Sequence, residues 1–346
     1  MDRFDIKDAC LSVEHDPQGR FWNSKWNLHR DVLEQYNLPK RVTITDSTVR
    51  EGGEVPHVVY KMEDKLRITR LLDEMNVHEI DCGFASTSQG DLDFLKHLDA
   101  EKLKIKKSVV ARIEVPDYKQ GIDRVVNANA DIVICALYAH LTPIPESGRA
   151  EYCQRVKDAV SHCKRSGVFT SFWVPCTNWE ETFVLDIYGA AVDGGADGIK
   201  TAGGGYLTVP AYKRMVKLLK GISKDIELGI HVHNNYGLAT ACTLAAVEAG
   251  ASNVGTSVNG LSHGSGLAAF EEVVMALTVL YGFDLGIKIE RIMELSRLVQ
   301  EITGIKVPLH KPIVGESVFP ETPEKRPRLE KRKAQTFIEP EVIGQR

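Results

Sequence analysis

The stretch IELGIHVHNNYG, residues 226–237, decides the fold. Its first half is a short apolar run, and the helical pattern 238–249 follows directly, which indicates a strand leading into a helix. Residues i and i+2 of a strand project to the same side, so His231 and His233 are expected to point together near the strand's carboxyl end. Two imidazoles held in this way make half of a metal site. The same pair can also be purely structural, so a metal site needs a further ligand from elsewhere in the chain.

A matching stretch, VTITDSTVREGGE, occupies residues 42–54. Here too a β-branched run ends in a polar turn with glycines. The turn carries the acids Asp46, Glu51 and Glu54 and one cation, Arg50. If both stretches are parallel strands of one barrel, their carboxyl ends lie at the same rim. An acid from this turn and the two histidines could then close on one divalent cation.

The chain between and around these stretches has a regular alternation. Short runs rich in Val and Ile alternate with longer amphipathic stretches from Arg41 onward. The predicted strands end near Thr45, Gly83, Ala111, Ala136, Val174, Lys200, His231 and Ser257. Predicted helices include 62–75, 118–127, 149–166, 177–194, 210–219, 238–249 and 268–281. The pattern predicts an α/β fold, a (β/α)8 TIM barrel over residues 41–285, with a doubly wound open sheet as the alternative.

Segments of different character flank the predicted barrel. Residues 1–40 are polar and are expected to form an N-terminal extension that packs outside the barrel or on a partner subunit. A post-barrel helix over 289–303 and an extended segment make up residues 286–319. The tail, residues 320–346, is charged, mixed in sign and poor in apolar residues, so it is predicted to be flexible.

The composition excludes several classes of protein. Hydrophobic residues make up 43% of the 346 residues and charged residues 26%, as in soluble globular proteins. The net charge of −4 gives no reason to expect a nucleic-acid partner, and the lack of an 18-residue apolar run argues against a membrane span. The seven cysteines are scattered without CxxC spacing, which predicts reduced thiols and a cytoplasmic location.

Polar side chains gather at the predicted strand ends, where a TIM barrel carries its chemistry. Cationic side chains, several hydroxyls and a candidate metal triad suit a small, oxygen-rich anion such as a 2-oxo acid. These residues are Arg50, Glu51, Glu54, Ser86 to Ser88, Arg112, His140, Thr142, Lys200, Thr201, His231, His233, Asn259 and His263.

Over roughly residues 41–319 the chain resembles a family of metal-dependent TIM barrels. That family includes homocitrate synthase, 2-isopropylmalate synthase, hydroxymethylglutaryl-CoA lyase and the 4-hydroxy-2-oxovalerate aldolases. A Glu at position 51, directly after Arg50, is similar to the homocitrate synthase variant of the opening motif. The resemblance rests on DSTVREG at 46–52, GFASTS at 83–88, HVHN at 231–234, VGTSVNGL at 254–261 and KPIVGESVF at 311–319.

The resemblance implies roles for individual residues. Glu51, His231 and His233 would bind a divalent metal (Mg, Mn or Zn), which acts as Lewis acid on a chelated 2-oxo acid. Arg50 would stabilise the developing negative charge on oxygen, and Arg112 would grip the substrate carboxylate. Substrate binding is expected of Glu54 and Thr201 as well. The family also implies an acyl-CoA co-substrate, most simply acetyl-CoA, and a homodimer or larger homo-oligomer.

The chain departs from the family pattern at four places. Lys200-Thr201 stands where the family usually has Asp-Thr, and a lysine there could act as a base or an anion clamp. His263 replaces an acid of the strand-8 loop, and Leu267 aligns with a metal-binding Asn of some members. No histidine follows His310, although the synthases carry a catalytic one in that region. The candidates to replace it are His57, His140 and His263, of which we assign His263, with Arg50 and Lys200, to catalysis.

Three functions are compatible with these patterns. The first is an acyltransferase that forms a carbon–carbon bond between an acyl-CoA and a 2-oxo acid. The second is an aldolase or lyase of the same family that cleaves a hydroxy acid to pyruvate or acetyl-CoA, which the missing post-barrel histidine favours. The third is a non-catalytic barrel that acts as a binding subunit, which the changes at Lys200, His263 and Leu267 would suggest.

Overall fold

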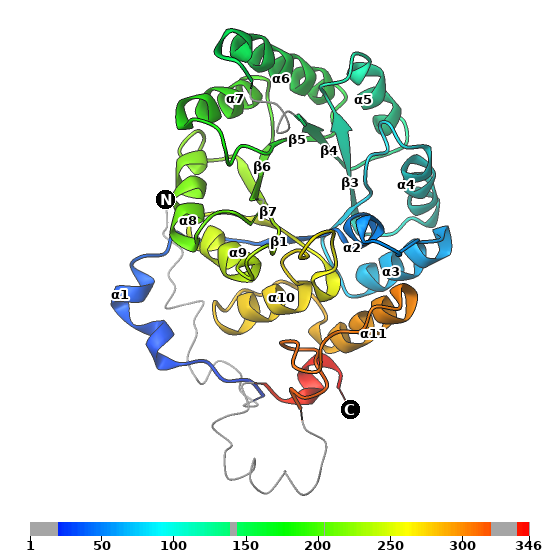
Figure 1. The fold of residues 1–346 in the computed structure, drawn as a ribbon, viewed down its shortest axis with the longest axis vertical. Helices are drawn as coiled ribbons and strands as arrows, with labels where there is room; N and C mark the ends of the chain where they lie inside the picture. Colours follow the sequence, from blue (N-terminus) through cyan, green and yellow to red (C-terminus); the bar gives the residue numbers. More distant parts are fainter. Residues whose placement is uncertain (1–19, 139–143, 204, 320–337, 346) are drawn as a thin grey trace, which may run out of the picture.

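The strands of the protein close into a barrel (Figure 1). The computed structural model describes residues 20–138, 144–203, 205–319 and 338–345. Every strand is parallel to its neighbours, and β1 pairs with β8 through Ile44 and Val254, which confirms the TIM barrel and excludes the open sheet. The strands are β1 (Thr43–Asp46), β2 (Glu79–Asp81), β3 (Lys106–Arg112), β4 (Ile132–Ala136), β5 (Phe169–Val174), β6 (Gly198–Gly203), β7 (Glu227–Val232) and β8 (Asn253–Thr256).

Helices surround the barrel in Figure 1 and cover the outer side of its strands. Each of the longer ones buries one apolar stripe on the strands beneath it. Within the described ranges, none has both the length and the apolar character that a membrane span needs. The helices are α1 (Arg30–Leu33), α2 (Thr48–Glu51), α3 (Met62–Glu74), α4 (Gln89–Glu101), α5 (Tyr118–Val126), α6 (Arg149–Lys164), α7 (Glu181–Asp193), α8 (Val209–Lys220), α9 (Ala239–Glu248), α10 (Phe270–Val279) and α11 (Ile292–Thr303).

Strand alternation sorts the buried side chains into two apolar clusters. In β4, Val133 and Cys135 point outward and join the large core between the barrel and its helices. Ile132, Ile134 and Ala136 point inward and belong to a small cluster inside the barrel. The side of the strand on which a residue lies therefore decides whether it can reach the barrel interior.

The described part of the N-terminal extension packs outside the barrel, as predicted. The Asn37 amide donates to the Glu248 carbonyl of α9 at 2.7 Å, and the Tyr36 and Tyr281 rings lie 5.8 Å apart. Phe21 forms an antiparallel bridge with Ile338 from the far end of the chain. Residues 20–40 therefore join elements that are distant in sequence.

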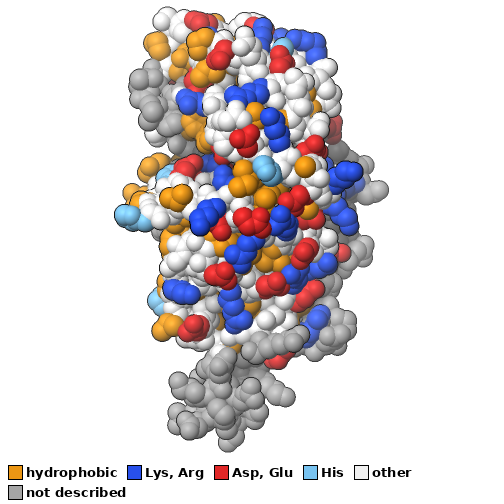
Figure 2. Space-filling model, turned by 90° about the vertical axis from the view of Figure 1, so that its right-hand side faces the viewer, with side chains coloured by type: hydrophobic (Ala, Val, Ile, Leu, Met, Phe, Trp, Pro, Cys, Tyr) orange, Lys and Arg blue, Asp and Glu red, His pale blue; other side chains and the backbone are white. Residues whose placement is uncertain are grey.

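In the space-filling view of Figure 2, charged side chains of both signs cover much of the surface shown.

The prediction of a flexible tail is wrong for residues 338–345. Ile338, Val342 and Ile343 are all buried, and the short 3-10 helix η6 (Pro340–Ile343) packs against the 3-10 helix η5 (Ile289–Arg291). In the sequence, the charged run before these apolar residues dominates the mean composition of the tail. Their burial supplies the local stability that the average composition of the tail obscured.

Candidate active site

A cavity of about 690 Å³ opens at the carboxyl ends of the strands. This volume is in the range of small-molecule sites. Charged and imidazole side chains from the turn after β1, from β7 and its turn, and from the turn after β8 line one side of it. Mostly apolar and aromatic side chains from β3 to β5 and the turn after β2 line the other, together with the polar Asp81 and Ser108. The predicted strand-end location of the site is thus where the cavity lies.

Asp46 shapes the turn after β1. Its carboxylate accepts hydrogen bonds from the Thr48 amide and the Thr48 hydroxyl, each at 2.9 Å, which fixes the start of α2. The Thr48 hydroxyl in turn accepts from the Val258 amide at 2.8 Å and ties the turn to the segment after β8. Burial raises the pKa of Asp46 to about 7, in spite of these bonds. Asp46 is therefore a structural residue that places Arg50 and Glu51 over the barrel.

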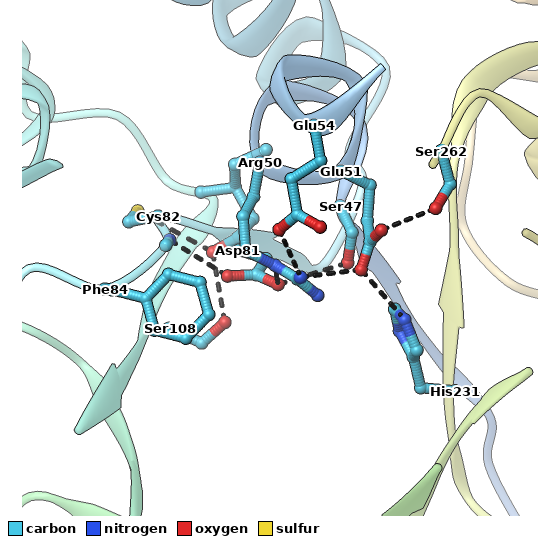
Figure 3. A network of polar contacts seen from close by, with 12 residues as sticks. Ser47, Arg50, Glu51, Glu54, Asp81, Cys82, Phe84, Ser108, His231 and Ser262 are labelled. Atoms are coloured by element: carbon cyan, nitrogen blue, oxygen red, sulfur yellow. Dashed lines mark hydrogen bonds and ion pairs between the residues drawn. The ribbon is translucent and has the colours of Figure 1, made fainter. Parts of the chain in front are cut away.

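Glu51 is the centre of the polar side of the cavity (Figure 3). Only 1% of the residue is exposed. Its Oε1 lies 2.6 Å from Arg50 Nη1 and 3.1 Å from His231 Nε2, while Oε2 accepts from the Ser262 hydroxyl at 2.5 Å and lies 3.3 Å from His263 Nδ1. Burial alone would raise the pKa of Glu51, but Arg50 and the two histidines hold it well below its usual range. The carboxylate is therefore ionised.

The structure brings Glu51, His231 and His233 together as the spacing predicted. One ligand atom from each of the three lies within 4.8 Å of the others, and the two imidazole rings are 5.1 Å apart. Burial, followed by the neighbouring His231, lowers the pKa of His233 to about 4, so its ring is neutral at pH 7 and keeps a lone pair. One carboxylate and two imidazoles are a donor set that fits a divalent cation.

Arg50 lies among three carboxylates. Its Nε is 2.6 Å from Asp81 Oδ2, and its Nη1 is 2.6 Å from Glu51 and 3.4 Å from Glu54 (Figure 3). Burial alone would lower the pKa of Arg50, but Asp81 and Glu51 raise it well above its usual value. The guanidinium is thus permanently charged and held on several sides.

Asp81 lines the cavity and pairs with Arg50, but it was not among the residues selected from the sequence. It ends β2 with its side chain toward the cavity, and it also accepts from the Gly83 amide at 2.9 Å. The strand was predicted to end at Gly83, so only residues after Gly83 were considered as candidates for the site. An acid two residues before a predicted strand end was the signal that could have identified Asp81.

Glu54 and His263 lie at the mouth of the cavity. His263 Nδ1 is 3.0 Å from Glu54 Oε2, and the His263 ring lies 4.6 Å from the ring of His233. The contact with Glu51 raises the pKa of His263. Half of the His263 side chain is exposed, so an incoming substrate can reach it.

Thr201 is not brought together with the other candidate residues. It is completely buried, its hydroxyl lies 3.8 Å from Cys176 Sγ, and it is not part of the cavity lining. Since Lys200 points into the barrel, its neighbour on the strand must point outward, toward Tyr188 of α7. This placement does not support the expected contact between Thr201 and the substrate.

Arg112 lies at the rim, outside the cavity lining. Its Nε donates to Glu114 Oε1 at 2.5 Å, and its guanidinium lies 5.4 Å from the centre of the Tyr138 ring. The sequence analysis expected Arg112 to bind the substrate carboxylate, but the near acid Glu114 occupies its Nε donor.

Lys200 lies deeper than the sequence analysis placed it. Strand β6 continues to Gly203, so Lys200 is three residues, or roughly 10 Å, below the end of the strand. Its Nζ donates to Glu79 Oε1 at 2.8 Å, and Asn253 Nδ2 donates to Glu79 Oε2 at 3.1 Å. These three residues form the floor of the barrel interior, and the lysine charge is balanced there.

Replacing Lys200 with methionine is expected to reduce the free energy of unfolding by about 3 kcal/mol or more, because it leaves the Glu79 carboxylate buried without a countercharge. The double variant Lys200→Met/Glu79→Gln should recover most of the loss. Urea denaturation of the three proteins measures both effects. Equal losses in the single and double variants would show that the ion pair is not what stabilises the floor.

Several other candidates lie away from the cavity or have structural partners. His57 is exposed in a loop, Ser86 donates to the Val110 carbonyl, and Asn259 donates to the Ser296 carbonyl. Leu267 pairs through its backbone with His233, so it supports the position of that histidine. His140 and Thr142 lie outside the described residues.

Comparison with known proteins agrees with this geometry. The 2-isopropylmalate synthase of Methanocaldococcus jannaschii is 34% identical over 327 residues, which cover 92% of this chain but only 62% of that protein. The homocitrate synthase AksA of Methanopyrus kandleri is 35% identical over 294 residues, which cover 84% of this chain and 73% of that protein. The chain thus spans less than two thirds of the length of the isopropylmalate synthase.

Solved structures share the fold at lower identity. The hydroxymethylglutaryl-CoA lyase of Pseudomonas aeruginosa is 16% identical, with a TM-score of 0.63 over 85% of this chain and 99% of that one. Residues 41–299, most of the chain, match the family model described as HMGL-like. With its closed barrel and its motifs at the strand ends, the chain belongs to the HMGL-like family.

Proposed function

We propose that the protein condenses an acyl-CoA, most simply acetyl-CoA, with a 2-oxo acid in a reaction that depends on a divalent metal. The observation that carries this proposal is the group of Glu51, His231 and His233 beside Arg50 in the cavity. Relatives at 34–35% identity that are named isopropylmalate and homocitrate synthases support the same reaction class.

The proposed metal ligands are Glu51, His231 and His233. Their mixed oxygen and nitrogen donors suit Mg, Mn or Zn. A divalent cation held there would supply Lewis acidity toward the carboxylate and ketone oxygens of a 2-oxo acid. Ser262, which donates to Glu51 Oε2, would keep the carboxylate oriented.

Arg50 is proposed to stabilise the negative charge that develops on the former ketone oxygen as the new carbon–carbon bond forms. Its guanidinium is charged, largely buried and already fixed by Asp81 and Glu51. A donor that is fixed in advance in a site with little water stabilises such charge without reorganisation during the reaction. Arg50 therefore meets the electrostatic requirement of this step.

The reaction also needs one proton removed from the acyl methyl group and one returned to the alkoxide, and free thiol is released when water hydrolyses the thioester of the condensed product. His263 is the proposed acid/base group, because it lies at the open mouth of the cavity and its Nδ1 contacts Glu54. Glu54 would fix the orientation of the imidazole and so leave Nε2 for proton transfer. Lys200 is not assigned to this role, since its amine is bound to Glu79 on the floor.

The reverse direction is the second candidate. Cleavage of a hydroxy acid to pyruvate or acetyl-CoA would use the same groups, and a hydroxymethylglutaryl-CoA lyase shares the fold. A non-catalytic barrel is the least favoured hypothesis, because the metal-ligand group and Arg50 are both intact.

The test is release of free thiol from acetyl-CoA with a panel of 2-oxo acids, before chelation, after chelation and after return of Mg, Mn or Zn. We expect release that needs both the acid and the metal, and a condensation product in the mass spectrum. If the metal-loaded protein released no thiol with any acid of the panel, the result would contradict the proposal. Pyruvate or acetyl-CoA formed from 2-hydroxy or 3-hydroxy acids would instead support the lyase.

A further inference from the structure

The side of the cavity opposite the metal-ligand group is apolar. We use the name apolar wall for six residues on or next to β2 to β5 that line the cavity: Phe84, Val110, Ile134, Ala136, Tyr138 and Trp173. Because β3 to β5 lie across a closed eight-stranded barrel from β7 and β8, the wall faces His231 and His233.

The aromatic residues of the apolar wall are more exposed than the residues of the hydrophobic core. Phe84, Tyr138 and Trp173 lie inside the barrel, yet all three are only partly buried. The rings of Phe84 and Tyr138 are 5.8 Å apart, and those of Tyr138 and Trp173 are 4.8 Å apart, both pairs tilted by 51–55°. The three rings thus form a continuous concave surface that is open to the cavity. A recessed apolar surface of this kind indicates that a ligand covers it.

Cations near the wall are already paired. Arg112, whose guanidinium lies 5.4 Å from the centre of the Tyr138 ring, donates through its Nε to Glu114, and Lys200 on the floor donates to Glu79. Arg50, 5.9 Å from the Phe84 ring, lies among Asp81, Glu51 and Glu54. The six residues of the apolar wall carry no charge themselves, so an acceptor side chain that packs on them meets apolar and aromatic surface. An acceptor with an acidic side chain would therefore bury a charge at high cost.

We propose that the 2-oxo acid acceptor carries an aromatic side chain, which packs against Phe84, Tyr138 and Trp173. This inference rests on the proposed function, since it assumes that the carboxylate and ketone bind on the side of Glu51, His231 and His233. An acceptor held there can extend its side chain across the barrel, toward the wall. Aromatic rings gain from tilted and offset contacts with other rings beyond the area they bury, and the small side chain of Ala136, the last residue of β4, lies between Ile134 and Tyr138 in the sequence and takes up little of the cavity.

The test compares kcat/KM for phenylpyruvate, 3-methyl-2-oxobutanoate, pyruvate and 2-oxoglutarate with acetyl-CoA and the metal-loaded full chain. We expect phenylpyruvate to exceed pyruvate at least tenfold and 2-oxoglutarate at least a hundredfold. A preference for pyruvate, 3-methyl-2-oxobutanoate or 2-oxoglutarate would overturn the inference.

Substitutions in the apolar wall test whether its residues cause the preference for phenylpyruvate over pyruvate. Trp173→Leu should raise KM for phenylpyruvate about tenfold and change that for pyruvate less than twofold. Phe84→Leu provides a second, independent variant if the first does not fold. Trp26→Phe, at an 80% exposed tryptophan outside the barrel, is the matched control and should change neither value. Equal changes for both acids in the two wall variants would overturn the inference.

Calorimetric binding of the same four acids to the metal-loaded protein, without acetyl-CoA, separates the two proposals. If no acid is condensed but phenylpyruvate still binds at least tenfold more tightly than pyruvate and loses this advantage in Trp173→Leu, the wall has its proposed role and only the reaction is wrong. If condensation occurs without any preference for phenylpyruvate in binding or turnover, the proposed function stands and the inference about the wall fails.

Discussion

The variant Glu51→Gln is expected to lose at least about three orders of magnitude in kcat/KM for condensation, because it removes the single carboxylate among the proposed metal ligands. It also leaves Arg50 and His231 without the negative charge that faces both of them. The measurement is thiol release from acetyl-CoA at saturating metal, with far-ultraviolet circular dichroism to establish that the variant is folded.

A matched control for Glu51→Gln is Glu101→Gln. Glu101 pairs with Arg70 on the outer surface, far from the cavity lining, so its activity should stay within twofold of the wild type. A folded Glu51→Gln variant with more than a tenth of wild-type activity would mean that the chemistry does not depend on this carboxylate.

The variant Arg50→Lys is expected to lower kcat by a factor of about 10² to 10³, the usual cost of removing one donor to a developing oxyanion. A guanidinium can contact Asp81, Glu51 and Glu54 at once, whereas an ammonium group is a single point of charge and cannot span them. KM for the 2-oxo acid should change little, because the interaction grows mainly in the transition state.

Metal content separates two interpretations of the Arg50 result. We expect Arg50→Lys to keep its bound metal while kcat falls, since the proposed ligands remain in place. Loss of metal together with kcat would show that Arg50 acts by positioning Glu51, and an unchanged kcat would contradict the assigned role.

The barrel could be predicted from the sequence because its signal is repeated. Each strand contains Val or Ile, most of the longer helices have an apolar stripe, and the alternation recurs along the chain. The pairing of His231 with His233 follows from strand periodicity alone. Glu51 could be predicted to lie near these histidines because the carboxyl ends of parallel strands lie at one rim of the barrel.

The remaining errors come from strand ends and from side-chain partners. Strand β6 has a lysine in the middle and glycine at its end, so its last residue could not be read from apolar character. A shift of that end by three residues put Lys200 on the floor, and alternation turned Thr201 away from the cavity. Arg50 meets Asp81 through packing between neighbouring strands, which local sequence patterns do not encode, whereas the partner of Arg112, Glu114, lies only two residues further along the chain.

The most direct test of the central claim is elemental analysis of the purified protein and of His233→Ala, both after mild chelation and return of a divalent metal. We predict close to one ion per chain in the wild type and little in the variant, with Trp26→Phe retaining the wild-type content as a control. Equal metal content in wild type and His233→Ala, or none in either, would contradict the proposal that Glu51, His231 and His233 bind the catalytic cation.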